Sequence, residues 1–170
     1  MRRTVGIIVI SVALGTAAFV VATIGGRFSD GPLRVIPGIP GGPLSGEGVR
    51  GSDPDWSFVR DVDTIELQIG SSPARSIFTG VVVYKGALYV PVTLAPLKRW
   101  PKVVSRDSRV VARIDGRLFE REAVSVSEPE MLEQLISAGQ SKYGPPFHAT
   151  WTGRFTRYFR LDPLPAPQSQ

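Results

Sequence analysis

Residues 75–92 read RSIFTGVVVYKGALYVPV, and residues 109–126 read RVVARIDGRLFEREAVSV. Each stretch holds two runs rich in β-branched and aromatic residues, which favour strands. The runs are separated by Lys85-Gly86 in the first stretch and by Asp115-Gly116 in the second. A two-residue connection that ends in Gly suits the tight turn of a hairpin, because Gly adopts positive φ without steric cost. The sequence therefore predicts two β-hairpins.

The Asp-Gly turn also sets the register of the second hairpin. It places Arg109 opposite Glu122 and Val111 opposite Glu120. Opposite charges that face each other across two strands stabilise the pair. The charges of this hairpin therefore have local partners.

Further elements flank the two hairpins. TIELQI at the end of 61–69 alternates apolar and polar residues and predicts a half-buried strand. Ser127-Glu128-Pro129-Glu130 is typical of a capped helix start, and the helix is expected to end after Tyr143, before Gly144-Pro145-Pro146. A last strand is expected at about Phe155–Leu161. This order predicts a mostly β domain, a small six-stranded barrel with one amphipathic helix.

A charge-free, apolar stretch precedes this domain. No charged residue lies between Arg3 and Arg27. As a helix this stretch is roughly 30 Å long, which matches the hydrocarbon thickness of a bilayer. We therefore predict a single N-terminal transmembrane helix. The alternative is a signal peptide that is cleaved after Val20 and Ala22, near Thr23, but the apolar run is longer than a usual signal core.

The flanking charges predict the orientation. Arg2 and Arg3 stand directly before the helix, whereas Asp30 lies between the basic residues Arg27 and Arg34 that follow it. Positive charge favours the cytoplasmic side. The prediction is a single-pass membrane protein with its N-terminus inside, its C-terminal domain extracytoplasmic, and the lipid bilayer as its partner.

A stretch rich in Gly and Pro joins the helix to the domain. Seven Gly and five Pro fall between Asp30 and Asp55, so this stretch cannot form a helix or a central strand and is expected to act as a flexible tether. The predicted organisation is a transmembrane anchor over 1–27, a linker over 28–55, a split-barrel-like domain over 56–163 and a disordered tail over 164–170.

The pattern of the domain resembles the flavin-binding split-barrel superfamily, which includes pyridoxamine-phosphate-oxidase-like proteins and deazaflavin-dependent nitroreductase-like proteins. The resemblance rests on RSIFTGVVVYKGALYVPV, on KRWPKVVSRDSRVVARIDGRLFEREAV, on the capped helix and on FRLDP. It implies a split β-barrel, a candidate homodimer, and flavin mononucleotide (FMN) or deazaflavin as candidate cofactors. At the positions that match the family's phosphate site stand Arg75, Ser76, Lys98 and Arg99, and guanidinium, ammonium and hydroxyl donors suit a phosphate.

Other chemistry has little support in the sequence. There is no Cys, which excludes disulfides and thiol nucleophiles. The single His, His148, follows Pro145-Pro146 in an expected loop. We therefore predict no metal site, and haem is less favoured than a flavin. Trp56, Trp100 and Trp151 are expected to be core or rim residues.

Three functions remain open at this point. The Gly-Arg-x-Ser-Gly element common in the deazaflavin group is missing, since the matching position reads SSPARSI. This absence favours a cofactor-free binding or assembly module of the envelope. The alternative is a flavin- or deazaflavin-binding redox enzyme, so enzymatic activity stays undecided. The third is a basic lipid- or nucleic-acid-binding domain; because acidic residues alternate with the basic ones along the hairpin, nucleic acid is a disfavoured partner.

Overall fold

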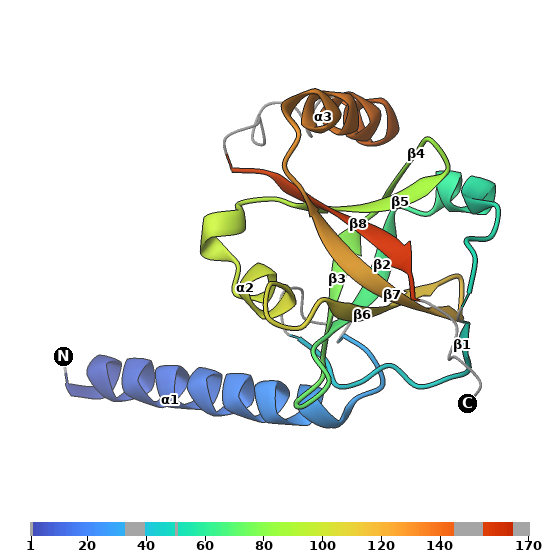
Figure 1. The fold of residues 1–170 in the computed structure, drawn as a ribbon. Coiled ribbons are helices and arrows are strands. Elements are labelled where there is room, and N and C mark those ends of the chain that lie inside the picture. Colours follow the sequence, from blue (N-terminus) through green and yellow to red (C-terminus); the bar gives the residue numbers. More distant parts are fainter. Residues whose placement is uncertain (1, 33–39, 50, 145–154, 165–170) are drawn as a thin grey trace.

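A computed structural model describes residues 2–32, 40–49, 51–144 and 155–164, with the side chains of 2–11, 13 and 14 left aside. A curled sheet forms the body of the molecule, with helices at its rim (Figure 1). The helices are α1 (Arg2–Gly25), η1 (Gly26–Phe28), η2 (Trp56–Asp61), η3 (Ala95–Leu97), α2 (Trp100–Val104) and α3 (Pro129–Tyr143). The strands are β1 (Gly48–Val49), β2 (Thr64–Ile69), β3 (Arg75–Gly80), β4 (Val82–Tyr84), β5 (Ala87–Val92), β6 (Arg109–Ile114), β7 (Arg117–Val126) and β8 (Arg157–Pro163).

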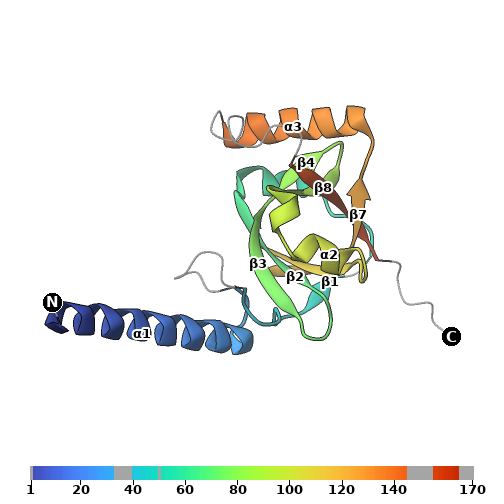
Figure 2. The same cartoon turned by 90° about the vertical axis from the view of Figure 1, so that its left-hand side faces the viewer.

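Seven of these strands form one antiparallel path. Its order is β3-β2-β6-β7-β8-β5-β4, and β1 pairs with β7 in parallel, outside this path. The path curls on itself (Figure 2). Its two edge strands, β3 and β4, directly follow each other in the chain. The predicted mostly β architecture, a half-barrel with helices, is confirmed.

Both predicted hairpins are present with the expected register. Lys85 and Gly86 have φ of 48° and 76°, and Asp115 and Gly116 have φ of 50° and 74°. Positive φ at both central residues gives a turn whose twist matches that of the flanking strands. Arg109 faces Glu122 and Val111 faces Glu120, as the turn predicts.

The predicted count of six strands is wrong for one main reason. The run that reads as a single strand before Lys85 forms two, β3 and β4, because the chain changes partner at Val81 from β2 to β5. Val81 is fully buried, and both its N–H and its carbonyl contact the Tyr143 hydroxyl rather than a strand. The short β1 is the other strand that the sequence did not predict.

The helix α3 begins one residue later than its capping motif suggests. Its N-cap residue is Glu128, with no side-chain cap bond, so Ser127 does not act as the cap. The helix ends at Tyr143 as predicted, followed by Gly144 with φ of 78°. The predicted loop with Pro145, His148 and Trp151 lies outside the described residues, as do the residues after 164.

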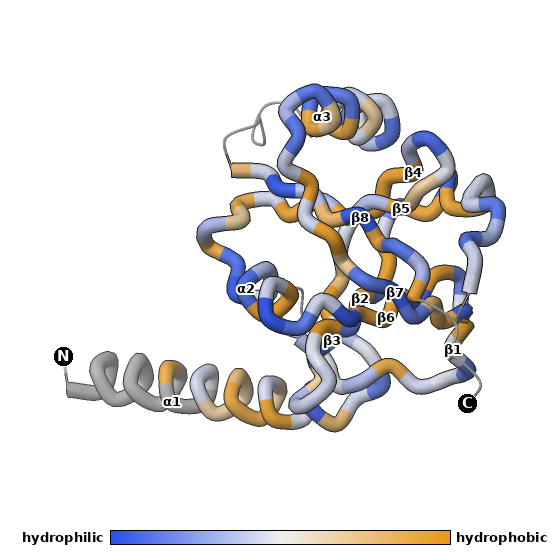
Figure 3. Tube along the Cα trace, viewed as in Figure 1, coloured by the Kyte–Doolittle hydropathy of each residue, from blue (hydrophilic) through white to orange (hydrophobic). Residues whose placement is uncertain are grey.

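The barrel interior is a continuous apolar core. Trp56, predicted as core or rim, is 2% exposed, and its ring centroid lies 5.0 Å from that of Phe119. Leu135 of α3 is fully buried in a second cluster against β4, β5 and β8. Hydrophobic residues recur along the strands, while the turn between β4 and β5 is hydrophilic (Figure 3). Burial of apolar side chains therefore holds α3 against the sheet.

The Gly/Pro-rich segment is fastened to the barrel in its described parts. Gly41 and Ser76 exchange two backbone hydrogen bonds of 2.9 and 3.2 Å, and Gly48–Val49 pairs with β7. The Arg113 guanidinium bridges the carboxylates of Asp30 and Glu66. The expectation of a flexible tether is therefore wrong for these residues. They are held by hydrogen bonds to sheet edges and by an ion pair, and the partner residues are distant in the sequence. The predicted domain boundaries stay predictions.

The helix α1 extends away from the barrel (Figures 1 and 2). Its described side chains at Val12, Phe19, Val20, Val21 and Ile24 are exposed. Within the part of the chain that the structure describes, no helix combines the length and the apolar character of a membrane span. The predicted anchor begins among side chains that are not described, and it stays a prediction.

Candidate functional site

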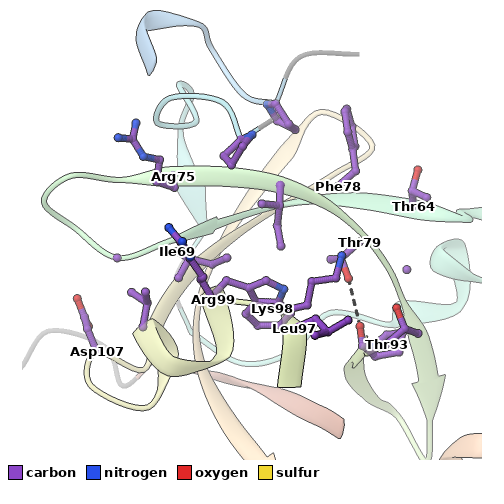
Figure 4. Close-up of a pocket in the computed structure, with 18 of the residues that line it drawn as sticks. Thr64, Ile69, Arg75, Phe78, Thr79, Thr93, Leu97, Lys98, Arg99 and Asp107 are labelled. Carbon is purple, nitrogen blue, oxygen red and sulfur yellow. Dashed lines mark hydrogen bonds between the residues drawn. The ribbon is translucent and has the colours of Figure 1, made fainter. Parts of the chain in front are cut away.

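A cavity of about 1320 Å³ lies beside β3 (Figure 4). One wall is formed by the ends of β2 and β3 and the loop between them, and the facing wall by η3 and α2. Pro32 and Pro40 from the Gly/Pro-rich segment, Pro91 and Thr93 at the end of β5, and Tyr143 from the end of α3 also line it. The site is therefore assembled from four separate parts of the chain, held together by the closure of the sheet.

The cavity has an extended apolar surface. Leu97 and Val103 are 77% and 42% exposed, and Phe78 is 36% exposed. Trp100 packs its ring 5.5 Å from that of Phe159, which fixes the indole against the barrel core. The apolar lining residues are Ile69, Ile77, Phe78, Pro91, Leu97, Trp100 and Val103. Such a surface suits a flat apolar or aromatic group.

Four cationic side chains line the same cavity. They are Arg75, Lys98, Arg99 and Arg106. None of the four forms an ion pair or a side-chain hydrogen bond with any residue in the described ranges. The lining also holds two carboxylates, Asp63 and Asp107, and Asp107 contacts Ser71 and Arg109. The cavity therefore has an excess of unpaired positive charge, which favours an anionic ligand.

Three of the four residues predicted for a phosphate site line this cavity. They are Arg75, at the start of β3, and Lys98 and Arg99, between η3 and α2. Figure 4 shows Lys98 and Arg99 below the β3 ribbon, whereas the Arg75 guanidinium lies above it. The structure thus places two of these cations on one side of the strand and the third on the other.

Ser76, the fourth predicted residue, does not face the cavity. It is fully buried, and its hydroxyl donates a hydrogen bond of 2.6 Å to the carbonyl of Gly42. Side chains alternate along a strand, so neighbours in sequence point to opposite faces. Ser76 therefore holds the Gly/Pro-rich segment against β3 instead of offering a donor to a ligand.

One end of the cavity is fixed by two residues that the sequence did not reveal. The Tyr143 hydroxyl lies 2.8 Å from the nitrogen and the carbonyl oxygen of Val81 and 2.8 Å from the carbonyl of Asp63. The Lys142 ammonium donates to the carbonyls of Val59, Val62 and Val81 over 2.6–3.0 Å. Together they satisfy the backbone groups that the switch between β3 and β4 leaves without a strand partner.

Burial also affects the ionisation of these two residues. It raises the pKa of Tyr143 and lowers the pKa of Lys142. Tyr143 is a neutral hydroxyl at neutral pH, as an ordinary Tyr is, and burial widens that margin. Neither residue stands out in the sequence, since both are simply the last residues of an amphipathic helix. Only the closure of the barrel brings Tyr143 to the cavity and Lys142 to the backbone behind it.

Neutral hydroxyls occupy the part of the cavity nearest Tyr143. Thr64, Thr79 and Thr93 all belong to the lining. Thr79 donates a long hydrogen bond of 3.4 Å to the carbonyl of Pro91, seen as the dashed line in Figure 4. The cavity thus has a cationic part at η3 and α2 and a neutral polar part between β3 and β5.

Comparison with known proteins shows a likeness of fold only. No protein-family model matches the sequence, and no curated protein does. Among solved structures, the chain is similar to HutZ, the haem storage protein from Vibrio cholerae, with a TM-score of 0.53 and 14% identity over 64% of this chain and 87% of that chain.

Two further solved structures show the same likeness. The conserved hypothetical protein Rv2991 from Mycobacterium tuberculosis has a TM-score of 0.50 and 20% identity over 64% of this chain and 77% of that chain. Atu2129 from Agrobacterium tumefaciens, of unknown function, has a TM-score of 0.51 and 18% identity over 68% and 57% of the two chains. The resemblance to the split-barrel superfamily expected from the sequence is confirmed at the level of the fold.

Proposed function

We propose that the cavity beside β3 binds a phosphate-bearing ring cofactor of the flavin or deazaflavin type. The observation that carries this proposal is the joint presence of unpaired cations and an apolar wall in one cavity of about 1320 Å³. The sequence alone favours a cofactor-free module and gives this cofactor-binding function as the alternative. A cofactor-free module leaves the four cations of the cavity without an anionic partner inside it.

The cations supply the phosphate site. Lys98 and Arg99 lie on one side of β3, and Arg75 stands on the other (Figure 4). Hydrogen bonds from charged donors to a phosphate are roughly twice as strong as neutral ones, and a guanidinium can donate two in parallel. In our proposal Lys98 and Arg99 hold the phosphate, and Arg75 adds a further donor from the opposite side.

The apolar wall and the hydroxyls suit the ring system. Trp100, fixed against Phe159, offers a flat face for stacking, and Ile77 belongs to the same wall. The hydroxyls of Thr79 and Thr93 can pair with polar atoms at the ring edge. A bound flavin or deazaflavin supplies hydride transfer, so the proposed class of activity is oxidoreduction.

Haem is the second candidate, because HutZ is a haem storage protein of similar fold. The cations of the cavity suit carboxylates such as haem propionates. Haem iron, however, is usually bound by His, Cys, Met or Tyr. Of the described lining residues none is His, Cys or Met, and the hydroxyl of Tyr143 is engaged by backbone groups. The described residues therefore fit a flavin better.

A titration of the purified full chain tests the proposal. FMN, a deazaflavin and haem are added in turn, and binding is followed by visible absorption and by quenching of Trp fluorescence, since Trp100 lines the cavity. We expect saturable binding of FMN or of the deazaflavin, with weaker binding of haem. A colourless protein that binds none of the three would restore the cofactor-free module as the better function.

We further propose that the chain is anchored in a membrane with its barrel extracytoplasmic. The support is the charge-free stretch from Thr4 to Gly26, with Arg2 and Arg3 before it. The described part of α1 is coloured white to orange by hydropathy in Figure 3. A cleaved signal peptide remains the rival explanation for the same residues.

A further inference from the structure

The segment from Ala95 to Arg106, APLKRWPKVVSR, forms an exposed rim of the barrel. We call it the η3–α2 rim. It presents two apolar side chains to solvent, Leu97 at 77% and Val103 at 42% exposed. Two apolar side chains this exposed on one short segment indicate a surface that a partner covers.

The same rim is strongly basic. Its four cationic residues are all exposed, and no acidic residue lies among them in the sequence. They are Lys98, Arg99, Lys102 and Arg106. None has an ion-pair partner among the described residues of the chain. The rim thus combines free positive charge with exposed apolar groups on a segment of 12 residues.

The rim is held in a fixed conformation by its inner side. Ala95, Pro101 and Val104 are buried, and the N–H of Ala95 donates to the carbonyl of Phe155 at 2.9 Å. Trp100 packs on Phe159. The exposed side chains are therefore displayed together on a rigid support.

The rim also lies on a particular side of the molecule. In Figure 1, η3 and α2 occupy the side of the barrel toward which α1 extends, and Figure 2 brings this side to the front. Phe28, at the barrel end of α1, is 86% exposed. Such an exposed apolar side chain beside the end of α1 suits the boundary between headgroups and acyl chains.

We propose that the η3–α2 rim docks on an anionic bilayer surface, with Leu97 and Val103 entering the headgroup layer and Lys102 and Arg106, which the proposed cofactor phosphate does not use, contacting lipid phosphates. Surfaces of this composition bind at the membrane interface through buried apolar area together with attraction to anionic lipids. Each Lys or Arg near such a surface adds to the attraction. The contact extends beyond the cofactor site, since Lys102 does not line the cavity.

A second copy of the chain is the main rival as the occupant. In a two-fold dimer the same patch meets itself. Lys98, Arg99 and Lys102 would then face identical cations, which is unfavourable unless anions intervene. The described rim offers no carboxylate to relieve this repulsion. Charge complementarity therefore favours the bilayer.

A single fluorescent label reports the docking. The chain has no Cys, so Ser105→Cys creates one labelling site on the exposed part of the rim. The full chain carrying an environment-sensitive dye there is reconstituted into bilayers of phosphatidylcholine alone or with phosphatidylserine. A second protein carries the dye at Lys85→Cys, on the turn between β4 and β5.

We expect a blue shift and quenching by lipid-phase quenchers for the label at position 105 in the anionic bilayer. The shift is weaker in the neutral bilayer and absent at position 85. Lys102→Glu changes the charge by two units and should lower the ratio of docked to free rim by roughly thirtyfold. Arg60→Glu, the same change at an exposed site on η2, should leave it unaltered.

Several results would overturn this proposal. One is dye emission at position 105 that shows an aqueous environment in both bilayers. Another is a full chain that does not float with vesicles of either composition. A further one is a blue shift of the dye at position 105 in detergent solution, without bilayers, that grows with protein concentration. This result would assign the rim to contact with a second copy of the chain. A shift in detergent on adding DNA would assign it to nucleic acid. Lys102→Glu should bind FMN normally, so failure of the docking and failure of the cofactor site are distinguishable.

Discussion

Replacing Arg75 and Arg99 together with Ala is expected to weaken FMN binding by about two to four orders of magnitude. Each charge-assisted hydrogen bond that is lost contributes roughly 1.5–3 kcal/mol, and a tenfold change in affinity corresponds to about 1.4 kcal/mol. The measurement is the dissociation constant, determined by titration of the full chain under the same conditions as for the unaltered protein.

Matched variants make this result specific. Arg60→Ala removes an exposed arginine outside the cavity lining and should leave the affinity unchanged. In the proposed arrangement Arg99 and Lys98 approach the phosphate from one side of β3 and Arg75 lies across the strand, so Arg99→Ala alone should cost more than Arg75→Ala alone. If the double variant bound FMN as tightly as the unaltered chain, these arginines would not hold the phosphate.

Placing two arginines in the middle of the N-terminal apolar stretch, Leu14→Arg with Ala18→Arg, should move the chain from the membrane to the soluble fraction. An arginine at the centre of a membrane helix costs roughly 2.5–3.5 kcal/mol on the insertion scale, so the pair costs about 5–7 kcal/mol. The unaltered chain should stay with the membranes through a high-pH wash and leave only with detergent.

Phe28→Arg is the control for this prediction. It adds a similar charge just beyond the apolar stretch, at a residue that is already exposed, and should leave the chain in the membrane fraction. An unaltered chain recovered in soluble form, shortened to begin near Thr23, would show that the stretch is a cleaved signal peptide and not an anchor.

The local elements of this fold follow from local sequence. Both hairpins are readable because Gly86 and Gly116 stand at turn positions that require positive φ, and the register follows from the turn. The end of α3 is readable from Gly144 for a similar reason. These features depend on a few neighbouring residues, so no tertiary information is needed to predict them.

The missed features depend on residues far apart in the chain. The break at Val81 falls inside an uninterrupted β-rich run, and it is stabilised by Lys142 and Tyr143, about 60 residues later. The docking of Gly41 on Ser76 likewise depends on an edge of the sheet that exists only after the barrel closes.

The candidate site shows the same division. Arg75, Lys98 and Arg99 could be chosen from residue chemistry and from the resemblance, and all three line one cavity. Ser76 matches the phosphate position in the sequence but does not line the cavity. The direction of its side chain depends on strand pairing, which turns the hydroxyl toward the carbonyl of Gly42. Tyr143 was missed because a helix-terminal Tyr carries no signal until the helix is placed against the barrel.

The central claim is that this cavity holds the cofactor, and hydrogen exchange tests its location most directly. Exchange of backbone amides is measured on the full chain with and without saturating FMN, since bound ligand suppresses local opening where it contacts the protein. The account predicts slower exchange at β3, over residues 75–80, and at 97–103. Unchanged exchange at these residues, or protection confined to β6 and β7 in the middle of the sheet path, would contradict it.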